Sequence, residues 1–153
     1  MFEQDYLMRM LLSFAQAIRR SMLKTQGQSD PKASAHLIEA AIGEATEMDG
    51  DILLSLAPES FAGVLKVSGT DPRVVEYVAQ SLLLEASFLR DDGNHEKANL
   101  RKEQAYSLAR AYQVEIGLEE LTEEEWEEFF SQDKEPTQEE IEQLNAPPES
   151  GLR

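Results

Sequence analysis

The sequence predicts an all-α protein, a helical bundle of antiparallel hairpins with an acidic C-terminal tail. Apolar residues recur at spacings of three and four along most of residues 1–118. Asp30 and Asp71 are each followed by proline, a pair that marks a helix start because aspartate caps the first turn and proline needs no partner there. No segment combines two-residue alternation with β-branched enrichment, so strands are not expected.

The first predicted helix covers residues 3–25 and is apolar on more than one side. This distribution favours packing in the core. Self-association through residues 6–22, as a two-fold homodimer, is the alternative. A membrane-surface helix is a third interpretation, which the acidic residues at the start of the helix disfavour.

The middle of the chain is predicted to hold two further helices. Asp30-Pro31 opens one over residues 31–48, and Pro58 opens the next over residues 58–68. These two helices are a weaker candidate for a second hairpin.

The strongest pattern predicts two antiparallel helices, over 71–91 and 95–115, joined by a tight turn at Gly93. Small residues lie where the two helices would touch, which allows a close approach. Their spacing resembles that of a tetratricopeptide hairpin. The small residues are Ala86, Ala98 and Ala105.

Glu85 falls near the centre of the apolar arc of the helix over 71–91. A buried carboxylate must be paired or protonated. In a hairpin that turns at Gly93, position 85 lies across from Arg101, which is itself on the apolar face of its helix. We expect an internal ion pair between Glu85 and Arg101. The alternative is that one of them points into a groove and contacts a ligand.

The C-terminal region differs in charge from the rest of the chain. Residues 119–153 carry 13 acidic residues against two basic ones, a net of −11 out of the total of −16, so residues 1–118 carry −5. We expect an acidic helical tail over 119–146 and a disordered end over 147–153.

Three aromatic residues in this tail, Trp126, Phe129 and Phe130, share one face of a short helix that begins with a capping box at Thr122. We expect them to dock the tail on the bundle or on a second subunit. The alternative is that this acidic, aromatic segment inserts into a protein partner.

The sequence lacks the residues that several kinds of catalytic and metal site require. The chain has no cysteine, and His36 and His95 are too far apart in sequence to form a helical metal site. No phosphate loop, nucleophile elbow or zinc-protease motif is present. We therefore predict no catalytic residue, no cofactor and no metal.

Charge and hydropathy bear on nucleic-acid binding, membrane insertion and cellular location. A net negative chain argues against binding to a phosphate backbone. No apolar run is long enough to span a bilayer, and acidic residues stand where a signal peptide would be basic. We expect a cytoplasmic protein.

The opening MFEQDYLMR, residues 1–9, resembles the start of an uncharacterised bacterial family, a domain of unknown function. Its members open with MF-x-Q-D-Y-x-M-R and continue into a helical, tetratricopeptide-like region. The resemblance implies a helical fold and brings no catalytic residues. We therefore predict a non-catalytic protein-interaction or scaffold module. The alternative is a small-molecule-binding protein or enzyme with an inter-helix pocket near Glu85 and Arg101.

Overall fold

The computed structural model describes residues 6–7, 9–18, 20 and 30–116, and all the secondary structure among them is helical. This confirms the predicted all-α class. We call the described residues 6–20 the N-terminal helix. The helices that follow are α2 (Pro31–Thr46), α3 (Gly50–Leu54), α4 (Pro58–Val67), α5 (Pro72–Asp91) and α6 (His95–Tyr112).

Both predicted Asp-Pro starts are present. The Asp30 side chain accepts a hydrogen bond from the Ala33 amide at 3.1 Å, and the Asp71 side chain accepts one from the Arg73 amide at 2.8 Å. Each aspartate satisfies an amide that has no partner within the helix. These caps fix where α2 and α5 begin.

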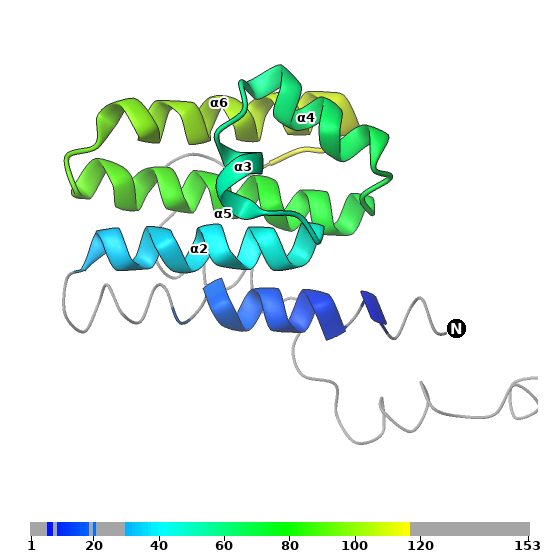
Figure 1. Ribbon diagram of the computed structural model, residues 1–153, viewed down its shortest axis with the longest axis horizontal. Helices are drawn as coiled ribbons and strands as arrows, with labels where there is room; N and C mark the ends of the chain where they lie inside the picture. Colours follow the sequence, from blue (N-terminus) through cyan, green and yellow to red (C-terminus); the bar gives the residue numbers. More distant parts are fainter. Residues whose placement is uncertain (1–5, 8, 19, 21–29, 117–153) are drawn as a thin grey trace, which may run out of the picture.

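The predicted hairpin is formed by α5 and α6, which lie side by side and run in opposite directions (Figure 1). Gly93 turns the chain with a φ of 81°, a conformation in which a Cβ is costly. Ala86, Ala98 and Ala105 are buried, as the close approach requires. The likeness to a tetratricopeptide pair stays a prediction.

The weaker candidate for a second hairpin, residues 31–48 against 58–68, is not formed. Among the helices α2 to α6, α2 packs mainly on α5 and α3, whereas α4 packs on α6. The short helix α3 carries the chain from the α2 side of the bundle to the α6 side (Figure 1). The wide apolar arc of α5 explains the outcome, because it offers α2 a larger surface than α4 does.

The N-terminal helix packs into the same core. Leu11, Phe14 and Ile18 are buried there, and the Phe14 ring meets the Tyr77 ring of α5 edge to face, with centroids 6.2 Å apart. Core packing of this helix is therefore confirmed. The homodimer through residues 6–22 stays a prediction.

The acidic tail over 119–146, with Trp126, Phe129 and Phe130, lies outside the described residues. The end over 147–153 lies outside them too. In the part of the chain that the structure describes, no helix is long and apolar enough to cross a bilayer.

Candidate functional site

A buried cluster of polar side chains, which we call the charge network, joins α2, α5 and α6. Its members are Glu39, Glu85, Arg101 and Gln104, of which Glu85 is 0% and Arg101 4% exposed. The predicted pair is present, because Arg101 Nε donates to Glu85 Oε2 at 2.8 Å. The antiparallel register of the hairpin places these two side chains opposite each other.

Arg101 has further partners beyond the predicted one. Its Nη2 donates to Glu39 Oε2 at 2.9 Å, and its Nη1 donates to the Leu54 carbonyl at 2.7 Å. Nη1 also reaches Gln104 Oε1 at 3.1 Å. Gln104 Nε2 donates to the carbonyls of Leu54 and Leu56 at 3.0 and 2.9 Å. The network therefore satisfies carbonyls at the end of α3 that have no helical partner.

The two carboxyl groups of the network differ in charge state. Burial raises the pKa of Glu85 well above its usual value, against the attraction of Arg101, and a hydrogen bond with Glu39 raises it further. Burial also opposes ionisation of Glu39, but hydrogen bonds with Glu85, Arg101 and Lys97 lower its pKa to about 2. Lys97 Nζ lies 3.0 Å from Glu39 Oε2. Glu39 thus carries the charge, and Glu85 tends toward the neutral acid.

Glu85 and Arg101, the centre of the charge network, are closed to ligands, whereas Glu39 lines one of the smaller cavities. Neither Glu85 nor Arg101 lines any of the three cavities described below, and the guanidinium of Arg101 is used on three sides by the chain itself. This geometry fits an internal pair and gives no support to a ligand contact.

The sequence analysis missed Glu39 and Gln104. A signal was available for both, since Gln104 follows Arg101 by three residues on the same helical face and Glu39 lies beside Ile38 and Ile42 on the buried face of α2.

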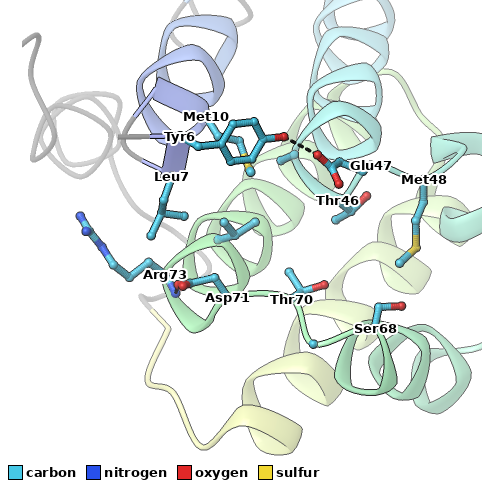
Figure 2. A pocket seen from close by; sticks show the side chains of 13 residues that line it. Tyr6, Leu7, Met10, Thr46, Glu47, Met48, Ser68, Thr70, Asp71 and Arg73 are labelled. Carbon is cyan, nitrogen blue, oxygen red and sulfur yellow. Dashed lines mark hydrogen bonds between the residues drawn. The ribbon is translucent and has the colours of Figure 1, made fainter. Parts of the chain in front are cut away.

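A cavity of about 780 Å³ opens between the N-terminal helix, the end of α2 and the connection from α4 to α5. We call it the open cavity. Figure 2 shows the Tyr6 hydroxyl and the Glu47 carboxylate meeting on one side of it, with Thr70 and Asp71 opposite. Its base is apolar and its edge polar. Base residues are Leu7, Met10, Ala45 and Val74, and edge residues include Tyr6, Glu47, Asp71 and Arg73.

A tyrosine and a carboxylate stand at the mouth of the open cavity. Tyr6 is 55% exposed, and its hydroxyl donates to Glu47 Oε1. That hydrogen bond and the negative charge of Glu47 raise the pKa of Tyr6. Glu47 ends α2 in the left-handed conformation, with a φ of 58°, a position that glycine usually occupies.

Two smaller cavities adjoin the open cavity, because they share lining residues with it. One of about 390 Å³ follows the seam between the N-terminal helix and α2 and shares Tyr6 and Met10. The other, of about 510 Å³, shares Met48. It is lined by four acidic side chains, Glu39, Glu44, Asp49 and Asp51.

No group of three or more histidine or acidic side chains within the described ranges could hold a metal ion. His36 does pair with one acidic residue, since its Nδ1 lies 3.4 Å from Glu39 Oε1.

No family model, curated protein or solved structure matches this chain. The resemblance of residues 1–9 to a bacterial family therefore stays a prediction.

Proposed function

We propose that this protein is a non-catalytic protein-interaction module whose binding surface is the open cavity with its two neighbours. The observation that carries the proposal is the apolar base formed by Met10, Ala45 and Val74, which opens to the surface between three separate elements. Apolar surface rimmed by polar groups is typical of protein-binding sites. The intermediate exposure of Met10 adds a flexible side chain that adapts to different partners.

The main alternative is a small-molecule-binding protein or an enzyme with a pocket near Glu85 and Arg101. It has less support, because both side chains are engaged inside the chain. The volume of the open cavity, about 780 Å³, does fall in the range of about 300–1,000 Å³ that small ligands occupy. A small molecule would therefore bind in the open cavity rather than at the charge network.

A protein is a better partner than a nucleic acid, since the chain has a net charge of −16. A second copy of the chain is the alternative protein partner. It would use the part of the N-terminal helix that the core leaves exposed, such as Tyr6 and Arg9. Light scattering tests this alternative, because a mass near 17.2 kDa across micromolar concentrations excludes it. We place the module in the cytoplasm, in keeping with a chain without cysteine.

Co-purification from the native cells tests the proposal. Met10→Lys puts a charge into the base of the open cavity and into its smaller neighbour. Glu103→Lys is the control, since Glu103 is exposed on α6 and lines none of the three cavities. We expect proteins that bind the wild type and the Glu103→Lys variant to be lost from Met10→Lys. Melting temperatures of the three proteins check that all are folded. An unchanged set of partners for Met10→Lys would contradict the proposal.

A further inference from the structure

We infer that the open cavity receives a bulky apolar side chain from a segment of a protein partner that carries lysine or arginine beside it. The inference rests on the proposed function and adds the chemistry of the partner. Three features of the described residues carry it: the apolar base, the carboxylates around the end of α2, and the tyrosine at the mouth.

The base of the open cavity selects an apolar group. Leu7 and Met10 are only partly buried, and Ala45 and Val74 beneath them are fully buried. An apolar side chain that enters the cavity would remove the exposed parts of Leu7 and Met10 from water, which stabilises the complex by about 25 cal/mol for each Å² covered.

The end of α2 selects a positive charge. The last turn of α2 has no basic residue, although the exposed carbonyls at a helix C-terminus favour cations. Glu44 lies in that turn and Glu47 caps it, and Asp49 and Asp51 follow within one further turn of chain. The Glu44 and Asp51 carboxylates are exposed and have no partner among the described residues. Asp49 and Asp51 stand at the start of α3, where carboxylates are favourable. A cation from a partner would relieve the repulsion among the four carboxylates and the conflict of Glu44 and Glu47 with the end of α2.

Of the basic residues on the same surface, Arg9 shares a cavity with Glu44, whereas Arg73 lies farther from the end of α2. Arg9 lines the smaller cavity from the N-terminal helix, and Arg73 lines the open cavity from the start of α5. Figure 2 shows Arg73 beside Asp71, on the opposite side of the open cavity from Met48. The negative charge is therefore concentrated at the α2 end.

Tyr6 and Glu47 complete a site for a basic side chain. Tyr6 presents an exposed aromatic ring, and its hydroxyl is held by Glu47. A guanidinium or ammonium group gains from contact with an aromatic face and with a carboxylate at once. Both lie at the mouth of the cavity, so a basic residue next to the inserted apolar one would reach them.

Fluorescence anisotropy with labelled peptides and the full chain tests the inference. Four peptide sets are used, each built on one scaffold: a bulky apolar residue flanked by Lys/Arg, the same residue flanked by Asp/Glu, the same residue flanked by Ser/Gly, and Lys/Arg with no apolar residue. We expect the first set to bind about tenfold more tightly than each of the others, and salt to weaken this binding.

Two double variants separate the cavity from the general acidity of the chain. Glu44→Lys with Glu47→Lys reverses the charge at the α2 end, and we expect it to weaken the first set about tenfold and to improve the second. Glu103→Lys with Glu115→Lys makes the same charge change at exposed positions outside the three cavities. This control should bind the first set as the wild type does.

Four results would overturn the inference. They are equal binding of the acidic or neutral sets, equal binding of the set without an apolar residue, unchanged binding by Glu44→Lys with Glu47→Lys, and no binding of any set. The proposed function is judged separately with Met10→Lys. If acidic or neutral peptides bind and Met10→Lys abolishes that binding, the cavity is an interaction surface and only the inference about charge fails.

Discussion

The charge network and the open cavity use the same kinds of side chain in opposite ways. In the network, Glu39, Glu85 and Arg101 are buried and bonded to one another and to backbone carbonyls. In the smaller cavities beside the open cavity, Glu44 and Asp51 are exposed and have no partner within the described residues. Burial with direct hydrogen-bond partners, rather than charge, distinguishes the groups that hold the fold from those that are available to a partner. The network is complete except at Glu85 Oε1, which is buried without a hydrogen-bond partner.

The largest expected effect comes from breaking the network at its centre. Arg101→Met leaves Glu39 and Glu85 without their shared cation and the Leu54 carbonyl without a donor. We expect the free energy of unfolding to fall by about 3–5 kcal/mol, as when one member of a buried pair is removed. Urea denaturation measures the change.

The matched control is Arg110→Met near the end of the same helix. Arg110 is exposed and bonds only to Ser107 among the described side chains, at 3.2 Å. We expect it to cost less than about 1 kcal/mol. Equal losses for the two variants would show that the network contributes no more than a surface contact.

The second expected effect tests the junction between the two regions. A Cβ added at Gly50 would lie 2.8 Å from the Glu39 carbonyl oxygen, which is backbone and cannot rotate away. Gly50→Ala should therefore push α3 from α2 and draw the Leu54 carbonyl from Arg101. We expect a loss of about 1–3 kcal/mol by overpacking, measured by thermal and urea unfolding.

Gly63→Ala is the control for this substitution. Gly63 lies within α4, and a Cβ there meets nothing within 4 Å. We expect Gly63→Ala to stabilise the protein by about 0.4–1 kcal/mol, because alanine has the higher helix propensity. If Gly50→Ala is also stabilising, α3 is not held tightly against α2.

The sequence could predict the contacts that lie close along the chain. Helix starts follow from Asp-Pro pairs, and the pairing of Glu85 with Arg101 follows from counting residues away from Gly93 on two antiparallel helices. The partner of α2 could not be found this way. A pattern identifies which face is buried but not which helix covers it, and so the pairing with residues 58–68 was wrong.

The open cavity could not be predicted either. Its hydrogen bond joins Tyr6 to Glu47, 41 residues apart, and its edge is completed by the loop before α5. No spacing in the sequence relates these three segments. The helical pattern does place Glu39 on the buried face of α2, but it could not identify Arg101 as its partner, since that contact spans 62 residues. The predicted tail aromatics, Trp126, Phe129 and Phe130, stay a prediction.

The third expected effect is on the pH dependence of the free energy of unfolding, to which Glu85 and Glu39 contribute with opposite signs. Glu85 has a pKa raised well above its usual 4.5 in the folded state. Its stabilising contribution is therefore full below pH 4.5 and is lost as the pH rises through the folded-state pKa. Glu39 has a pKa lowered from 4.5 to about 2, so its contribution is present above pH 4.5 and is lost as the pH falls through about 2.

Glu85→Gln tests this assignment, because glutamine resembles the neutral acid in shape and cannot ionise. We expect the variant to lose the decline in stability above pH 4.5 and to keep the acid-side decline due to Glu39. Glu39→Gln should do the reverse. The measurement is urea unfolding across pH 3 to 9. Identical pH profiles for wild type and Glu85→Gln would mean that the pKa of Glu85 does not change on folding.

The smallest expected effect on stability distinguishes the cavity from the network most sharply. Glu47 and Gln113 both end helices in the left-handed conformation, with φ of 58° and 54°. Glycine at either position relieves backbone strain in the folded state. It also raises the conformational entropy of the unfolded chain, and the two effects on stability partly cancel. We expect Glu47→Gly and Gln113→Gly each to change stability by no more than about 1 kcal/mol.

The two glycine variants should differ only at the cavity. Glu47→Gly removes the carboxylate that raises the pKa of Tyr6, so the pKa of Tyr6 should fall toward its usual value, as followed by NMR titration of the tyrosine rings. Binding of basic, apolar peptides should also weaken. Gln113→Gly should change neither property, because Gln113 lines none of the three cavities. Equal behaviour of the two variants in both measurements would mean that Glu47 serves only to end α2, as Gln113 ends α6, and that the cavity mouth lacks the charge the inference assigns to it.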